Sequence, residues 1–267
     1  MEELLKVNDL NYSYLNKEIF NNLHFSIKKE SINLILGTNS SGKTTLIYLL
    51  SGILPSHDSI ELDGILLNHE NLKKYLLMIG VVFFDNNNKF LFDKVIDELT
   101  FPLENLNYKR NDILKRVREV TNLLDLNNCI NKKIKDLTNY EQVKVLIATS
   151  IMHKPKVIFL DSILDKLNSN ECKKIFKLLD KIKKNTSICI TSSNLDNILY
   201  FDNVLIMSDK TIKIKGAPKE VLQQDNELAK LGFIIPQMID LSLKLNFYGV
   251  LDEIITDVDG MVDKLWK

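Results

Sequence analysis

Residues 37–44 read GTNSSGKT and match the pattern G-x-x-x-x-G-K-[ST] of a phosphate-binding loop. The apolar residues 31–36 precede this motif, and residues 44–54 follow it with helical periodicity as far as Pro55. The motif requires this strand–loop–helix order, because its glycines let backbone N–H groups approach phosphates at the positive end of a helix. A polar turn that only caps a helix is the alternative. The flanking elements favour phosphate binding.

Two side chains of the loop, and one further along the chain, have expected roles. Lys43 should reach the β- and γ-phosphates, and the Thr44 hydroxyl should ligate Mg²⁺. Asp161 follows the apolar run VIFL, and an aspartate at such a strand end supplies the second magnesium-positioning group of phosphate-loop proteins. Thr44 and Asp161 are therefore the predicted metal-binding residues. The predicted nucleotide-binding residues of the loop are Gly37, Thr38, Asn39, Ser40, Ser41, Gly42, Lys43, Thr44 and Thr45.

The order of apolar runs predicts an α/β fold with a parallel sheet. Buried strands at residues 79–84, 157–160 and 188–191 accompany the loop, with a charged helix at 169–184 between the last two. Near the start of the chain, alternating apolar residues instead indicate an antiparallel β region. The other predicted elements are antiparallel strands at 4–10 and 19–27, a largely helical stretch from about 93 to 151, a hairpin at 204–214 and helices beyond about 222.

Composition narrows the classes of partner. Lysine plus arginine and aspartate plus glutamate balance at 35 each, so the chain has no basic excess and no nucleic-acid partner is expected. The cysteines Cys129, Cys172 and Cys189 are scattered and form no CxxC pair, which favours reduced thiols over a disulfide frame or a zinc site. No apolar run approaches the length of a membrane span, so work at a membrane would require partners.

Five further segments carry a family resemblance. They are LNYSY at 10–14, ELDG at 61–64, IGVVFFDNNNKFLFDKVIDELTFPLEN at 79–105, GAPKEVL at 216–222 and LGFIIPQMIDLSLKL at 231–245. Together with the phosphate loop they resemble the ATP-binding subunits of ABC transporters. Within these, they resemble the energy-coupling-factor (ECF) type, which drives uptake of vitamins and metal ions. The last segment, with Pro236, is similar to the C-terminal extension of ECF ATPases.

This resemblance implies a P-loop NTPase of ABC type with an N-terminal antiparallel β subdomain, a RecA-like parallel-sheet core, a helical subdomain at about 86–150 and a small C-terminal helical extension. It divides the chain into an ATP-binding domain at 1–222 and an ECF-type extension at 223–267. The implied cofactors are ATP and Mg²⁺, with Tyr14 stacked on the adenine.

The same resemblance implies partners. ABC ATPases work as head-to-tail dimers in which each nucleotide is clamped between the phosphate loop of one subunit and the signature motif of the other. We therefore expect a second ABC ATPase subunit in a heterodimer, a membrane-embedded ECF scaffold subunit and a substrate-binding component. The expected location is peripheral, at the cytoplasmic face of the cell membrane.

Four family motifs are altered in this chain. Phe84 stands in the glutamine slot, Ser162 in the slot of the catalytic glutamate and Ser192 in the histidine slot. The signature motif LSGGQ here reads Leu137, Thr138, Asn139, Tyr140 and Glu141. Tyr140 therefore has a large side chain where the family has a glycine. A positioned general base contributes roughly 10²–10⁴-fold to a rate. Since a serine hydroxyl is far too weak a base to replace a carboxylate, no catalytic group is intact and the chain's own pocket should hydrolyse ATP slowly.

Three functions are compatible with these motifs. The first is the ATP-binding subunit of an ECF-type importer that acts with a second ATPase, which makes the chain part of a transport enzyme with little activity alone. The second is a non-hydrolysing nucleotide-binding module that assembles or regulates a complex. The third, a P-loop kinase for a small molecule, predicts no signature-like segment.

Overall fold

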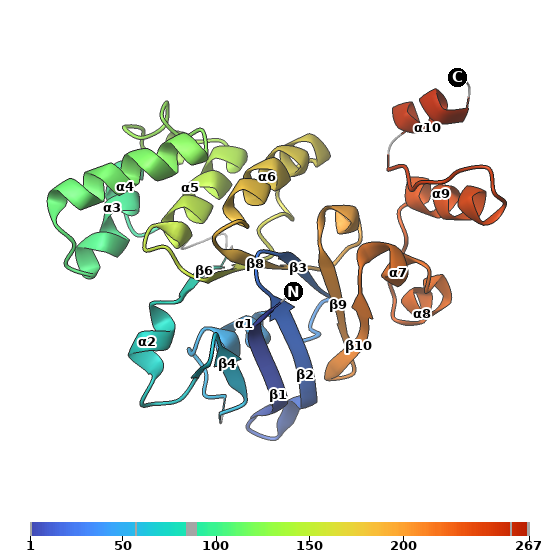
Figure 1. The fold of residues 1–267 in the computed structure, drawn as a ribbon, viewed down its shortest axis with the longest axis horizontal. Helices are drawn as coiled ribbons and strands as arrows, with labels where there is room; N and C mark the ends of the chain where they lie inside the picture. Colours follow the sequence, from blue (N-terminus) through green and yellow to red (C-terminus); the bar gives the residue numbers. More distant parts are fainter. Residues whose placement is uncertain (1, 57, 84–89, 257, 266–267) are drawn as a thin grey trace.

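The computed structural model describes residues 2–56, 58–83, 90–256 and 258–265 (Figure 1). Within them, one sheet has the strand order β2-β1-β4-β5 and is antiparallel. Burial alternates at Leu5 and Val7 of β1 and at Leu23, Phe25 and Ile27 of β2, as the sequence pattern predicts, whereas register shifts interrupt the alternation elsewhere in β1. The strands are β1 Glu3–Tyr14, β2 Lys17–Lys28, β4 Ile60–Leu62 and β5 Ile65–Leu66.

A second sheet forms the centre of the molecule and has the order β10-β9-β3-β8-β7-β6. Its strands are parallel except β10, which pairs antiparallel with β9. The strand β3 is buried along its whole length, as expected for a parallel strand covered on both faces. The strands are β3 Ile32–Gly37, β6 Ile79–Phe83, β7 Val157–Asp161, β8 Ser187–Ser192, β9 Asn203–Ser208 and β10 Thr211–Gly216.

Two hydrophobic cores lie on opposite faces of the central sheet. Leu34 and Leu36 of β3 belong to the core shared with the large helices, whereas Ile35 belongs to the core shared with α1 and the antiparallel sheet. Figure 1 shows α3 to α6 on one side of the sheet and α1 with the antiparallel strands on the other. These helices are α1 Lys43–Leu50, α3 Val95–Asn105, α4 Arg110–Leu123, α5 Asn139–Ile151 and α6 Ser169–Ile182.

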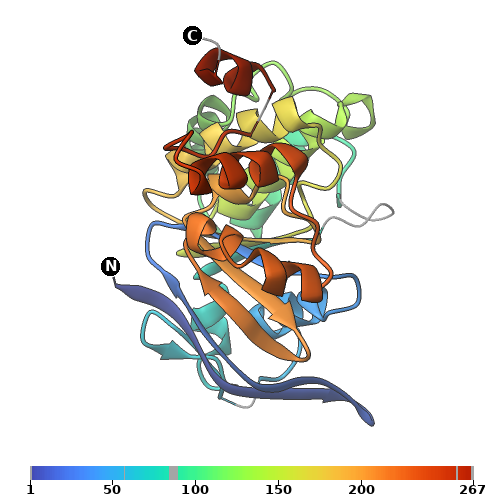
Figure 2. The same cartoon turned by 90° about the vertical axis from the view of Figure 1, so that its right-hand side faces the viewer.

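The C-terminal part of the chain is helical and runs along one flank of the molecule (Figure 2). It begins next to β10 and ends beyond the helices that cover the central sheet. Its helices are α7 Pro218–Leu222, α8 Asp225–Lys230, α9 Gln237–Phe247 and α10 Val258–Leu265. The shorter elements elsewhere are α2 Leu72–Leu76, η1 Ile134–Asp136 and η2 Ile198–Tyr200.

The predicted fold class is confirmed, with an antiparallel β subdomain, a parallel-sheet core and covering helices. Two predicted helix ends were wrong. The helix after the phosphate loop ends at Leu50 instead of residue 54, because Gly52 takes a left-handed conformation with φ +71°. The helix predicted to end at 184 stops at Ile182. The strand predicted to reach residue 84 is described to Phe83, and residue 84 lies outside the described residues. Among the described residues, no helix is long and apolar enough to cross a membrane.

Candidate nucleotide-binding site

The phosphate loop joins the end of β3 to the start of α1, as the sequence predicts. Gly37 is fixed by packing, since a Cβ at this position would lie 2.3 Å from the Ser41 Oγ. Gly42 has φ +99°, and a Cβ there would lie 3.1 Å from the ring of Phe20. Ser40 also has a left-handed backbone, with φ +64°, which costs a residue with a side chain roughly 1–2 kcal/mol. Such strain is typical of loops shaped for a ligand.

Lys43 lies at the first turn of α1 with its side chain directed back over the loop. Its Nζ donates hydrogen bonds to the Gly37 carbonyl at 2.7 Å and to the Thr38 carbonyl at 3.0 Å. Burial lowers the pKa of this ammonium group, and the carboxylates of Asp161 and Asp165 oppose that shift. The loop therefore holds a desolvated positive charge beside its backbone N–H groups, an arrangement suited to phosphate oxygens.

Thr44 and Asp161 are 117 positions apart in sequence and meet in the fold. The Thr44 Oγ1 donates a 2.8 Å hydrogen bond to the Asp161 Oδ2, which joins the start of α1 to the end of β7. A hydroxyl and a carboxylate oxygen are hard ligands of the kind that Mg²⁺ takes alongside substrate phosphates. The donor set at this point fits the predicted magnesium ion.

Thr191 at the end of β8 holds the other side of Asp161 and was missed by the sequence analysis. The Thr191 Oγ1 donates to the Asp161 Oδ1 and accepts a 2.9 Å hydrogen bond from the backbone N–H of Ser162. The Thr191 side chain is fully buried. The only sequence signal was a polar residue near the end of a buried apolar strand, and its place beside Asp161 depends on the pairing of β8 with β7.

The two serines in catalytic slots lie at the same edge of the sheet. Ser162 follows β7 with φ +52°, and its carbonyl accepts a 3.3 Å hydrogen bond from the Asp165 N–H. Ser192 ends β8, is buried, and its Oγ accepts a 3.2 Å hydrogen bond from the Asn194 N–H. Neither side chain is a carboxylate or an imidazole, so neither supplies a general base of ordinary strength. Phe84 lies outside the described residues.

Tyr14 ends β1, and 41% of its surface is exposed. Its ring meets the ring of Tyr12 edge to face, with centroids 5.0 Å apart. Tyr12 pairs across the strands with Phe20, whose ring also faces Gly42 of the phosphate loop. Tyr14 thus lies two residues further toward the hairpin turn, on a strand pair that reaches the loop.

The signature-like segment forms the start of α5. Thr138 caps this helix in a capping box: its Oγ1 accepts from the Glu141 N–H at 3.2 Å, and the Glu141 Oε2 accepts from the Thr138 N–H at 2.8 Å. These hydrogen bonds hold the pKa of Glu141 at about 2. The Tyr140 ring packs against the large core, and the Lys144 Nζ lies 5.0 Å from its centroid.

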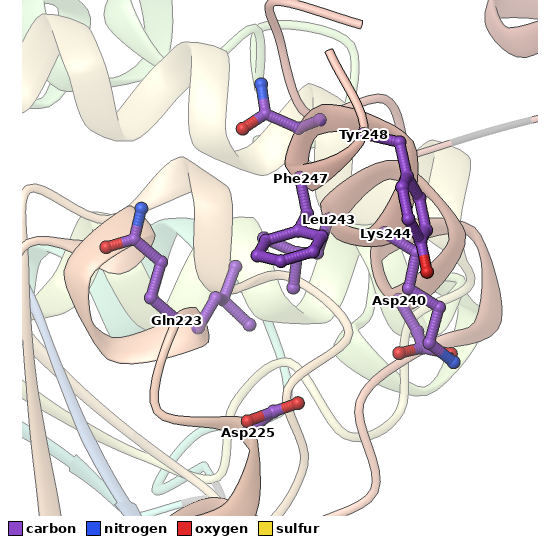
Figure 3. Close-up of a pocket in the computed structure, with 9 residues that line it drawn as sticks. Gln223, Asp225, Asp240, Leu243, Lys244, Phe247 and Tyr248 are labelled. Carbon is purple, nitrogen blue, oxygen red and sulfur yellow. The ribbon is translucent and has the colours of Figure 1, made fainter. Parts of the chain in front are cut away.

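The C-terminal helices approach the loop and also form a pocket. A Cβ at Gly232 would lie 3.7 Å from the Thr38 methyl, so the segment after α8 lies beside the phosphate loop. The pocket has a volume of about 470 Å³ and lies between α7, α8 and α9, with Phe247 directed into it (Figure 3). It is lined by Leu222, Gln223, Asp225, Asp240, Leu243, Lys244, Asn246, Phe247 and Tyr248.

Comparison with known proteins agrees with this architecture. The family model described as "ABC transporter" matches residues 20–164. The energy-coupling factor transporter ATP-binding protein EcfA1 of Mesomycoplasma hyopneumoniae strain J is 30% identical, over 99% of this chain and 98% of its own length. The energy-coupling factor transporter ATP-binding protein EcfA of Streptococcus pyogenes is 29% identical, over 88% of this chain and 87% of its own length. The structure of cbiO1 from Clostridium perfringens superposes with a TM-score of 0.78 at 28% identity, over 86% of this chain and 95% of that one.

The chain therefore belongs to the ABC transporter family of ATP-binding proteins. Within that family it is an ATP-binding subunit of an energy-coupling-factor type transporter, as the matched segments predicted. A separate structural match at 22% identity, an ATP-binding cassette in its ADP conformation, has a TM-score of 0.76 and supports the fold alone. The small-molecule kinase hypothesis is wrong, because the family model and the full-length relatives are those of transporters.

Proposed function

We propose that this chain binds MgATP in the phosphate loop and pairs with a second, different ATPase subunit to drive a membrane scaffold protein that imports vitamins or metal ions. The observation that carries the proposal is the hydrogen bond between Thr44 and Asp161, beside the desolvated Lys43. It supports a magnesium ion and triphosphate at one edge of the central sheet. The relatives named as energy-coupling factor transporter ATP-binding proteins agree with this cofactor.

The proposal extends to the division of the chain. Residues 1–222 make up the ATP-binding domain, with a helical subdomain at about 86–150, and residues 223–267 are the ECF-type extension. Tyr14 stacks on the adenine, and the segment from Leu137 to Glu141 faces the nucleotide held by the partner subunit. The exposed Tyr14 ring and the capping box at Thr138 are compatible with both roles.

Partners are proposed from the relatives. The cbiO1 structure is described as part of the ABC transporter complex cbiONQ, so that relative acts in an assembly with other components. We extend this to the present chain, with a scaffold subunit, a substrate-binding component and a peripheral place on the cytoplasmic face of the membrane. Isolation of this chain from native membranes, with its companions identified by mass spectrometry, tests the extension. Recovery without another ATPase contradicts the heterodimer.

Slow hydrolysis in the chain's own pocket follows from the hydroxyls in the catalytic slots. Ser162 and Ser192 take the places of a base and of the histidine that holds the attacking water. Restoring a carboxylate with Ser162→Glu is therefore expected to raise ATP turnover by about 10²-fold or more. Turnover of the purified chain and of the isolated complex measures this effect. Fast turnover by the unaltered chain alone contradicts it.

Nucleotide binding is tested separately from turnover. Lys43→Ala removes the buried ammonium group and should weaken MgATP binding at least about tenfold. The matched control is Lys177→Ala, which removes an exposed lysine from α6. Binding is measured with a fluorescent ATP analogue. Equal affinities for the two variants contradict the assignment of the loop as the nucleotide site.

The second candidate is a non-hydrolysing module that holds a transporter complex together. The serine at position 162, in place of the glutamate, favours this function. ATP turnover by the isolated complex distinguishes it from the motor function. If the complex hydrolyses ATP and Ser162→Glu accelerates it, the motor function stands. If the complex is inert and Lys43→Ala disrupts assembly, the module function replaces it.

A further inference from the structure

The pocket between α7, α8 and α9 shares no lining residue with the phosphate loop, and the proposed function gives it no role. Its volume of about 470 Å³ lies in the range of small-molecule sites, which is about 300–1,000 Å³. Leu222, Leu243 and the ring of Phe247 give it apolar walls, and the other lining residues carry polar groups. Such a combination is typical of a site for a small ligand.

Two aromatic side chains at this pocket have most of their surface open. Phe247 is 84% exposed and Tyr248 is 76% exposed, and their rings meet edge to face with centroids 5.4 Å apart. Figure 3 shows the Phe247 ring directed into the pocket, between Gln223 on one side and Lys244 on the other. Because the face of an aromatic ring is negative, the open ring of Phe247 attracts a cation.

The charged residues that line the pocket leave one negative charge in excess. They are Asp225 of α8, with Asp240 and Lys244 of α9. The Lys244 Nζ lies 2.7 Å from the Asp240 Oδ2, so these two charges compensate each other. The Asp225 Oδ1 accepts a 2.7 Å hydrogen bond from the Asn226 backbone N–H, and no lysine, arginine or histidine in the described part of the chain forms an ion pair with it. A cationic ligand would therefore be attracted by Asp225, and an anionic one repelled.

We propose that this pocket binds a small organic cation of the amidinium or guanidinium kind, with its charged end at Asp225 and a flat apolar body against Phe247. A planar cation of this class pairs with a carboxylate through two parallel N–H···O hydrogen bonds, and its face stacks on an aromatic ring. The walls at Leu222 and Leu243 remove the apolar body of the ligand from water. The inference does not depend on the nucleotide site.

Binding of benzamidine to the full chain tests the proposal, with benzamide as a neutral analogue of the same shape. An NMR titration of the chain labelled at phenylalanine and tyrosine measures the affinity and reports which rings the ligand contacts. Benzamidine should bind with a dissociation constant on the order of 1 mM or below and shift the ring signals of Phe247 and Tyr248. Benzamide should bind at least about tenfold more weakly, because it forms no charged hydrogen bond with Asp225.

Two variants separate the charge from the aromatic ring. Asp225→Asn keeps the shape of the side chain and should weaken benzamidine binding by about tenfold. Phe247→Leu keeps an apolar side chain without a π face and should weaken it by about two- to fivefold. Both positions are exposed, so both variants should fold, which circular dichroism checks. The matched control is Glu227→Gln, which removes a carboxylate that pairs with Lys230 on the same helix, outside the pocket, and should leave the affinity unchanged.

Three results overturn the inference. They are equal affinities for benzamidine and benzamide, a pocket variant that binds benzamidine as tightly as the unaltered chain, and a pocket covered by a second copy of the chain. The last result would appear in analytical ultracentrifugation as self-association that Phe247→Leu abolishes. Lys43→Ala should bind benzamidine like the unaltered chain while its binding of MgATP is weakened. The inference and the proposed function therefore fail separately.

Discussion

Thr191 joins the Asp161 carboxylate to the backbone N–H of Ser162, and its replacement by valine has a calculable cost. Thr191→Val keeps the shape of the side chain but removes the hydrogen bond to the Asp161 carboxylate and the acceptor for the Ser162 N–H. A hydrogen bond to a charged group contributes about 1.5–3 kcal/mol, and a buried N–H left without a partner costs about 1–3 kcal/mol. Because Thr191 is fully buried, water does not replace it, and a total loss of about 3 kcal/mol is expected.

This loss is measurable as a fall of about 6–12 °C in the melting temperature. Thr186→Val is the matched control: Thr186 is also buried, next to the start of β8, but donates only one hydrogen bond, of 2.9 Å, to the neutral Pro155 carbonyl. It should cost about 1 kcal/mol. Circular dichroism during heating compares the two variants. A Thr191→Val protein that melts no lower than Thr186→Val refutes the argument that this bridge holds the site.

Three other features have measurable consequences. Since the folded-state pKa of Glu141 is about 2, its carboxylate stabilises the fold above its unfolded pKa, and this stability is lost as pH falls toward 2. Glu141→Gln should therefore lower the free energy of unfolding by about 1–2 kcal/mol at pH 7 and by little at pH 2. Urea unfolding at both pH values measures the difference. Gly232→Ala should cost about 1 kcal/mol, because φ is +84° and its new methyl meets Thr38 only in ordinary contact; equal melting temperatures contradict this. Tyr14→Ala should weaken binding of a fluorescent ATP analogue by about 1–3 kcal/mol if its ring stacks on adenine, whereas an unchanged affinity removes that role.

The phosphate loop was predictable because its chemistry depends on a continuous stretch of sequence. Glycines, lysine and threonine have fixed spacings there, and the strand and helix on either side have clear periodicity. Asp161 was predictable for a related reason, since it ends a run of buried apolar residues. The conformation of Ser40 was not, because its motif position permits any residue and its left-handed backbone is set by the loop as a whole.

The end of β8 and the turn after β7 were harder to interpret. Thr191 belongs to the site only because β8 lies next to β7 in the sheet, and a sheet order is not written in the sequence around either strand. The turn at Ser162, with φ +52°, was not predicted either, because residues 162–165 (SILD) contain no glycine or proline that would mark a turn.

The signature segment illustrates a related limit. Tyr140 replaces a glycine, and from sequence alone its ring was expected in the space through which the partner's nucleotide approaches. The fold instead packs that ring against the core, next to the Lys144 ammonium group. The capping box occupies the start of α5. There the Thr138 hydroxyl accepts a hydrogen bond from the Glu141 N–H and donates one of 3.1 Å to the Glu141 carboxylate. The groups that would meet a phosphate at this helix are therefore committed to one another, and any clamp formed there must first exchange these hydrogen bonds for new ones.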